Sequence, residues 1–155
     1  MDIRPYRPDD LPALRALTAE AFRGVSIDYW IEQRFGLLNG RDWRWRKMRH
    51  IDDDTAANPA GVFVAEDEAG IAGYITTRVD KEAGLGLIPN LAVRADRRGS
   101  GLGRRLIEHA LAWFRTLGLT HAKIETLEQN PIGQHLYPAC GFQEVARQIH
   151  YVMKL

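Results

Sequence analysis

The sequence contains a single cysteine and no long apolar run, and both absences limit what the chain can be. With Cys140 alone, the 155 residues form no internal disulfide and no cysteine-rich zinc cluster. No stretch reaches the roughly 18 consecutive apolar residues that a membrane-spanning helix needs. The first residues, Met1–Pro5, lack the apolar core of a signal peptide. We therefore expect a cytoplasmic protein with no membrane partner.

An excess of charge of one sign is also missing. Twenty-one Lys and Arg residues face twenty Asp and Glu residues, for a formal net charge of +1. No global field draws such a chain to nucleic acid, so nucleic acid is not an expected partner. The five histidines show no metal-ligand spacing, and we expect no metal.

The composition is that of a packed domain. Hydrophobic residues make up 45% of the chain and charged residues 26%, close to the averages of soluble globular proteins. The length suits one unit with a real core, and no repeat, linker or low-complexity stretch interrupts it. We expect a single domain over residues 1–155.

The first third of the chain is predicted to be mainly helical. After a short strand at residues 2–6, apolar residues recur every three or four positions over residues 9–23 and stop at Gly24. A second helix begins near Ser26 and pauses at Asn39. Trp45 and Met48 indicate another short helical piece.

The rest of the chain alternates between strand and helix patterns. The expected elements are a hairpin of residues 62–65 and 71–79, a strand over 85–93, an amphipathic helix ending at Gly118, a strand over 122–127, a short helix over 130–140 and one or two closing strands over 142–153. This order predicts an α/β fold with a mixed sheet rather than regular βαβ alternation.

The most informative segment is Val93–Arg105, which holds three glycines and five arginines in thirteen residues. Glycines at alternate positions between a strand and a helix let backbone N–H groups converge on an anion, and the helix dipole adds positive charge. Arginine side chains bind phosphate oxygens as forks. The alternative is a glycine-rich turn beside a solvated basic helix face. The Gly-x-Gly-x-Gly spacing fits neither a Walker loop nor a dinucleotide fingerprint.

Two motifs resemble those of the GCN5-related N-acetyltransferases. Arg98-Gly99-Ser100-Gly101-Leu102-Gly103 is similar to that family's R/Q-x-x-G-x-G/A signature, and Asn130 with Leu136–Phe142 resembles its closing motif. The resemblance covers the whole chain. It implies a twisted mixed sheet of six to seven strands, flanked by about four helices and splayed between the fourth and fifth strands, with acetyl-coenzyme A in the splay.

The resemblance also implies which residues bind the cofactor. The pyrophosphate would lie on the loop Arg98, Gly99, Ser100, Gly101, Leu102, Gly103 and Arg104. The backbone of Leu91, Ala92 and Val93 would face the acetyl carbonyl and pair with the pantetheine arm. Asn130 would contact the pantetheine or order its loop; the residues alone also allow an N-cap before Pro131, and the two roles are compatible.

Tyr137 occupies the family's general-acid position, where a phenol protonates the departing sulfur of coenzyme A. The alternative is an aromatic side chain packed on the short helix. The general base is less defined, because no carboxylate stands near Pro89 or Asn90, where many relatives carry one. Glu125 resembles the base of members that acetylate protein N-terminal amines, and its alternative is a surface partner of Lys123 or an arginine.

These expectations lead to two function classes. The first is acetyl-coenzyme A-dependent acetylation of a primary amine, on a small molecule or a peptide, by direct attack in a ternary complex. The second is a non-catalytic acyl-coenzyme A-binding or regulatory domain on the same fold. We interpret the basic and aromatic stretch Arg41–Arg49 either as part of the wall of the acceptor pocket or as an ordinary helix. A nucleic-acid site is disfavoured because the acidic residues Asp52–Asp54 follow it. A monomer and a homodimer are both allowed.

Overall fold

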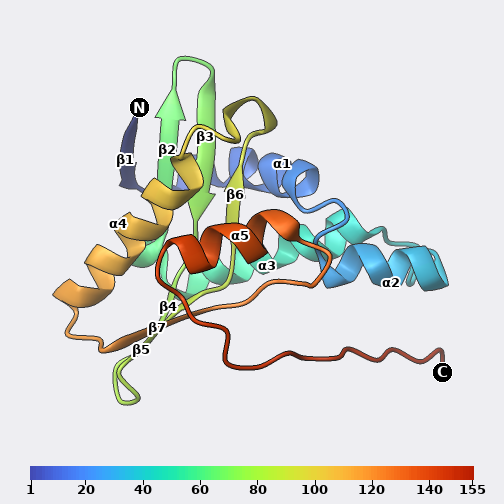
Figure 1. Ribbon diagram of the computed structural model, residues 1–155. Helices are drawn as coiled ribbons and strands as arrows, with labels where there is room; N and C mark the ends of the chain where they lie inside the picture. Colours follow the sequence, from blue (N-terminus) through green and yellow to red (C-terminus); the bar gives the residue numbers. More distant parts are fainter.

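The computed structural model describes residues 1–155 and contains five α-helices and seven strands (Figure 1). The strands are β1 (Asp2–Pro5), β2 (Phe63–Asp67), β3 (Gly70–Ile75), β4 (Arg78–Asp80), β5 (Leu85–Ile88), β6 (Leu91–Val93) and β7 (His121–Ile124). The α-helices are α1 (Leu11–Ala21), α2 (Ile27–Phe35), α3 (Trp43–Ala57), α4 (Leu102–Thr116) and α5 (Pro131–Ala139). None of the helices combines the length and the apolar content needed to cross a bilayer.

The strands form two sheets. The first has the order β1-β2-β3-β6 with antiparallel neighbours, and the second has the order β4-β5-β7, in which β5 and β7 are parallel. The expected hairpin is present as β2 and β3. Its second strand, expected to run to Val79, ends at Ile75, and β4 belongs to the second sheet.

One strand connects the two sheets and changes partner on the way. The stretch expected as a strand over 85–93 is divided at Pro89 and Asn90 into β5, in the second sheet, and β6, in the first. Proline has no backbone N–H to donate to a neighbouring strand, so the strand is readily interrupted at Pro89. The sheets consequently separate between β6 and β7. This is the splay between the fourth and fifth strands that the resemblance implied.

Helices cover both faces of the first sheet. Leu14, Ile51 and Val64 belong to the buried cluster under α1 and α3, whereas Phe63 and Ala65 pack with Leu106 on the α4 side. Side chains alternate along β2 because successive residues of a strand point to opposite faces. Figure 1 shows α4 and the α1–α3 pair on opposite sides of β2 and β3.

Two expectations about elements need correction. The short helical piece at Trp45 and Met48 is part of a full helix, α3, whose N-cap Asp42 accepts a hydrogen bond from the Trp45 N–H at 2.8 Å. The closing strands predicted over 142–153 were wrong, because this segment contains no strand. A strand requires a neighbour for its backbone, and residues 143–155 have none.

Candidate active site

The edge of β6 faces the separation between the sheets. The Asn90 carbonyl accepts from the Thr76 N–H at 2.9 Å and the Arg94 N–H donates to the Ala72 carbonyl at 2.8 Å, so the even-numbered residues bond to the β3 side. Hydrogen-bonding groups alternate along a strand, which turns the N–H and C=O of Leu91 and Val93 outward. Of the three predicted backbone positions, Ala92 is bound to β3, whereas the N–H groups of Leu91 and Val93 and the Leu91 carbonyl are open to a ligand; the Val93 carbonyl accepts from Arg98 Nε at 3.3 Å.

The glycine loop presents a row of unused backbone donors directly after this edge. Gly99 and Gly101 have φ angles of 74° and 81°, in the left-handed region that favours glycine, and Gly101 is the N-cap of α4. The N–H groups of residues 99–104 donate to no protein acceptor. Six consecutive free donors at a helix N-terminus form an anion site of the kind that holds phosphate.

The five arginines around the loop are in different electrostatic situations. Arg94 and Arg97 both bind Asp67 of the β2–β3 hairpin, at 2.8 and 2.6 Å, and Arg94 holds the pKa of Asp67 down at about 2. Arg104 pairs with Glu108 at 2.8 Å, and Arg105 donates to the Met1 carbonyl.

Arg98 differs from its neighbours because it pairs with no carboxylate. Its Nε donates only to the Val93 carbonyl, at 3.3 Å. The Arg98 guanidinium therefore keeps most of its donors for a ligand on the loop.

We expect Arg98→Ala to weaken acetyl-coenzyme A binding by about 10- to 100-fold, the value of one charge-assisted hydrogen bond. Arg97→Ala is the matched control, because Arg97 lies one residue earlier and is held by Asp67. Titration calorimetry of both variants measures the difference. An equal loss in both would mean that the loop responds to overall charge and not to the free guanidinium.

Tyr137 lies on α5, next to the loop. Its neighbour Leu136 packs against Gly103, where an added Cβ would come within 3.2 Å of Leu136 Cδ2 and 3.8 Å of Val93 Cγ2. The Tyr137 ring meets Phe142 edge-on, with centroids 6.4 Å apart, and its hydroxyl makes no hydrogen bond within the protein. Burial raises the pKa of Tyr137 to about 12, which keeps the phenol protonated.

Asn130 is an N-cap, one of the two compatible roles expected from the sequence. Its Oδ1 accepts from the Gly133 N–H at 3.2 Å, and its Nδ2 donates to Thr126 Oγ1 at 2.9 Å. An added Cβ on Gly133 would come within 2.8 Å of Thr126 Oγ1, 2.9 Å of Asn130 Nδ2 and 3.2 Å of Tyr137 Cε2. Glycine at 133 thus allows the cap and the Tyr137 ring to approach each other.

Gly133→Ala is expected to destabilise the protein by about 1–3 kcal/mol, the usual range for overpacking. This is the opposite of the general rule, in which alanine in a helix interior is about 1 kcal/mol better than glycine. Urea unfolding measures the change, and His135→Ala, at an exposed position of α5, is the control. Stabilisation by Gly133→Ala would show that the cap relaxes without cost.

Glu125 directly follows β7 and is exposed. It lines a pocket of about 80 Å³ together with Pro89 at the strand break, Lys123 beside it and Arg78 across the second sheet. A larger cavity of about 640 Å³ lies elsewhere, beside the start of β1, with a mainly charged lining.

A buried polar network behind the strand break was missed from the sequence. Lys47 Nζ donates to Asn90 Oδ1 at 2.6 Å, and Asn90 Nδ2 donates to Asp54 Oδ2 at 2.7 Å. Asp54 also accepts from Thr76 Oγ1 at 2.7 Å and from Arg78. Burial lowers the pKa of the Lys47 ammonium. The Asn90 side chain is 4% exposed, and both ends of its amide are hydrogen-bonded within the protein.

A sequence signal for this network exists in hindsight. Lys47 and Asp54 lie on the same helical stripe as the buried Trp43 and Ile51, at spacings of four, four and three residues. Charged residues on a buried stripe are rarely left unpaired, so their presence indicates a partner inside the protein.

Comparison with protein families identifies the chain. The model of the Acetyltransferase (GNAT) family matches residues 15–142. The chain belongs to the GNAT family. The match contains the free edge of β6, the glycine loop and α5, and it confirms the resemblance drawn from the two motifs.

Curated relatives share the sequence over most of this GNAT chain. A mycothiol acetyltransferase of Propionibacterium freudenreichii subsp. shermanii is 32% identical over 149 residues, which cover 94% of this chain and 44% of the relative. A mycothiol acetyltransferase of Parafrankia sp. is 27% identical and is covered to 54%, against 96% of this chain. The chain thus spans about half the length of the curated relatives that it matches.

Solved structures share the fold at low identity. The PaiA N-acetyltransferase from Thermoplasma acidophilum, in complex with coenzyme A, superimposes with a TM-score of 0.73 at 17% identity, over 92% of this chain and 89% of that one. An aminoglycoside 6'-N-acetyltransferase from Acinetobacter haemolyticus gives a TM-score of 0.68 at 16% identity, over 100% and 99% of the two chains. Both likenesses confirm the predicted fold class.

Proposed function

We propose that the protein transfers an acetyl group from acetyl-coenzyme A to a primary amine. The observation that carries this proposal is the row of free N–H groups at residues 99–104, next to the outward backbone of Leu91 and Val93. A pyrophosphate needs several converging donors, and a pantetheine arm with its amides needs an open strand edge. The site offers both, one directly after the other. The mycothiol acetyltransferase relatives support acetyl transfer as the reaction.

In the proposed reaction the amine nitrogen attacks the thioester carbon. A C–N bond forms, the C–S bond breaks, and the developing negative charge on the carbonyl oxygen is stabilised by an outward N–H of β6, at Leu91 or Val93. Glu125 takes a proton from the amine, directly or through water. Tyr137 donates the proton of its phenol toward the departing sulfur, and the phenol is later reprotonated from solvent.

Thiol release tests this proposal directly. The purified chain is incubated with acetyl-coenzyme A and a panel of primary amines that includes aminosugar, polyamine, aminoglycoside and peptide N-terminal acceptors. We expect free thiol and acetylated amine in equal amounts for at least one acceptor class. Tight binding of acetyl-coenzyme A with no turnover on any amine would instead identify a cofactor-binding regulatory domain.

Glu125→Gln is expected to lower kcat by about 10²–10⁴-fold without changing the affinity for acetyl-coenzyme A. The loss should shrink as the pH rises, because a larger fraction of the amine is then already deprotonated. Glu128→Gln is the control, since Glu128 is an exposed carboxylate three residues away that pairs with Arg147 at 3.4 Å. If Glu128→Gln lost activity and Glu125→Gln did not, the base would be Glu128.

A further inference from the structure

Lys47 of α3 carries a buried ammonium group that has no carboxylate partner. The residue is 9% exposed, and its Nζ donates to Asn90 Oδ1 at 2.6 Å and lies 4.3 Å from the centroid of the Phe22 ring. Nζ makes no ion pair, since Asp28 and Asp54, the carboxylates that act on it from farther away, pair with arginines. Such a lysine is unusual, because lysines inside proteins are nearly always paired with an opposite charge.

The stability of the fold does not account for this lysine. An ammonium loses its hydration on burial, and one neutral acceptor and a ring return only part of the lost free energy. Burial accordingly lowers the pKa of Lys47. An apolar side chain of similar length avoids this cost, and replacing buried ionic groups by apolar ones is often neutral or stabilising. What the lysine adds at this position is its hydrogen bond to Asn90.

Asn90 is held through its side chain and its backbone at the point where the strand changes sheet. Lys47 and Asp54 bind the two ends of its side-chain amide, at 2.6 and 2.7 Å. Its backbone N–H donates to Thr76 Oγ1 at 3.1 Å, and its carbonyl accepts from the Thr76 N–H at 2.9 Å. The preceding residue, Pro89, has no N–H to offer a neighbouring strand. Two side chains of α3 therefore hold the backbone where the strand is interrupted.

The carbonyl of Asn90 sets the direction of the next backbone N–H. The bond between Asn90 and Leu91 is trans, and a trans peptide unit is planar with its C=O and N–H pointing in opposite directions. Because the Asn90 carbonyl points to β3, the Leu91 N–H points away from β3, into the separation between the sheets. A rotation of this one peptide unit would turn the Leu91 N–H away from a ligand.

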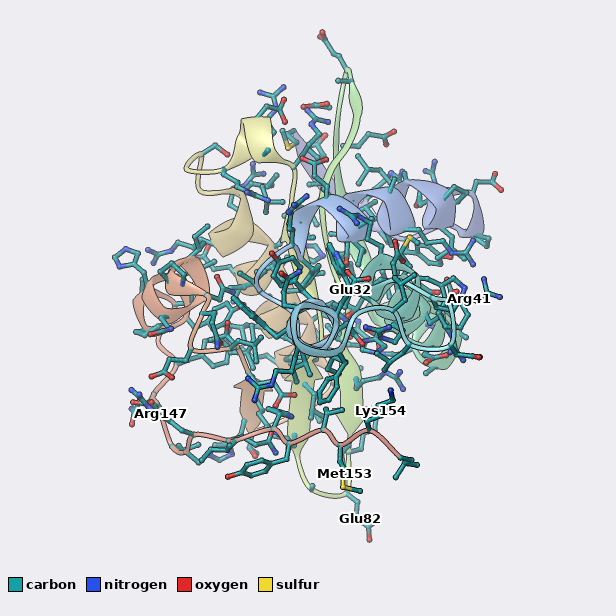
Figure 2. All side chains as sticks on the ribbon, turned by 90° about the vertical axis from the view of Figure 1, so that its right-hand side faces the viewer. Glu32, Arg41, Glu82, Arg147, Met153 and Lys154 are labelled. Atoms are coloured by element: carbon teal, nitrogen blue, oxygen red, sulfur yellow. The ribbon has the colours of Figure 1, made fainter.

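The contact reaches Asn90 from the side of the strands away from Tyr137. Figure 2 shows α3, which begins two residues after Arg41, and α5, which carries Tyr137, on opposite sides of the strands. Lys47 and Asp54 are two helical turns apart on α3, so one face of this helix binds both ends of the Asn90 amide. The support leaves the outward edge of β6 open.

We propose that Lys47 is a positioning residue for acetyl transfer, which through Asn90 fixes the peptide unit whose Leu91 N–H polarises the thioester carbonyl. Lys47 acts on the backbone of β6 and not on the reacting atoms. A preorganised N–H stabilises the charge that develops on the carbonyl oxygen, and a misplacement on the order of 1 Å lowers the rate by up to about 100-fold. The inference rests on the proposed acetyl transfer.

Infrared spectroscopy of bound acetyl-coenzyme A, isotope-labelled at the thioester carbonyl, tests this role without turnover. We expect the carbonyl band to lie at lower frequency on the wild type than on Lys47→Met, because an aligned N–H weakens the C=O bond. Calorimetry should show nearly the same affinity for both, since the glycine loop is unchanged. A band at the same frequency in both proteins would overturn the proposal. If the bands differ but no amine is acetylated, the proposed transfer fails and the positioning of the Leu91 N–H by Lys47 is retained.

Steady-state kinetics tests the same variant during turnover. Lys47→Met is expected to lower kcat by about 10- to 100-fold with little change in the KM for acetyl-coenzyme A. Thr18→Val is the control, because Thr18 is fully buried on the same side of the first sheet and its hydroxyl is 2.6 Å from the Tyr74 hydroxyl. This control should lose stability in urea and keep its kcat. An equal fall of kcat in both variants would assign the effect to general destabilisation and overturn the proposal.

A double-variant cycle tests whether Lys47 acts through Asn90. Asn90→Ala should lower kcat at least as much as Lys47→Met, and the combined variant should lose no more than Asn90→Ala alone, because the contact is then already absent. Losses that multiply would mean that Lys47 acts by another route and would overturn the proposal. The combined variant removes both the buried ammonium and its acceptor. Where a single variant does not fold, the combined variant takes its place in the infrared comparison with the wild type.

Discussion

Gly101→Asp is expected to weaken acetyl-coenzyme A binding by at least about 100-fold. The substitution places a carboxylate at the N-cap of α4, among the free N–H groups of residues 99–104, where the pyrophosphate would lie. Like charges brought together at a binding site cost several kcal/mol, and each 1.4 kcal/mol is a factor of about ten in affinity. Titration calorimetry with acetyl-coenzyme A measures the loss.

The variant needs a control for backbone strain, and the same helix provides one. Gly118, just beyond the C-terminal end of α4, has a φ of 75°, close to the 81° of Gly101, and an added Cβ at either glycine meets no atom within 4 Å. Gly118→Asp introduces the same charge in the same left-handed conformation at the opposite end of the helix. It should leave binding nearly unchanged. A similar loss in both variants would attribute the effect to strain and not to the anion site.

Tyr137→Phe is expected to lower kcat by roughly 10²–10⁴-fold with acetyl-coenzyme A affinity retained. The hydroxyl makes no hydrogen bond within the protein, so its removal leaves no buried group unpaired and the fold should remain as stable as before. Steady-state kinetics measures kcat, calorimetry measures the affinity for acetyl-coenzyme A, and urea unfolding measures the stability of the fold. Tyr6→Phe, a partly buried tyrosine in the α1–α3 cluster, is the control.

The pH dependence gives a second readout for Tyr137. Burial raises its pKa to about 12, so the phenol stays protonated and able to donate until the pH approaches that value. We expect kcat to rise as the acceptor amine loses its proton, and we expect no second fall in kcat at any alkaline pH below the pKa of Tyr137. A Tyr137→Phe variant with wild-type kcat would leave α5 a structural role only.

Periodicity alone located most of the helices and strands. The apolar stripe of α4 was visible because Leu106, Ala110 and Phe114 repeat at helical spacing and are all buried. For the division of residues 85–93, Pro89 was the one local signal, and the exchange of partners between β5 and β6 depends on the rest of the fold. The closing strands expected over residues 142–153 are a similar case: the local sequence suggested them, but a strand needs a neighbour for its backbone and residues 143–155 have none in this structure.

The candidate site was also predictable only in part from the sequence. The free donors of the glycine loop follow from glycines between a strand and a helix, which is a local pattern. Arg97 is paired with a carboxylate and Arg98 is not, because Asp67, thirty residues earlier in the chain, binds Arg97. The Lys47–Asn90 contact joins residues 43 apart. Pairings over such distances depend on the fold and carry no signature at either position alone.

Amide hydrogen exchange with and without coenzyme A tests whether the glycine loop and the edge of β6 form the cofactor site. We expect coenzyme A to slow the exchange of the backbone amides of residues 99–104, which have no acceptor in the protein, together with those of Leu91 and Val93 on the free edge of β6. Protection confined to another surface, such as the basic and aromatic stretch Arg41–Arg49, with residues 99–104 unchanged, would contradict it.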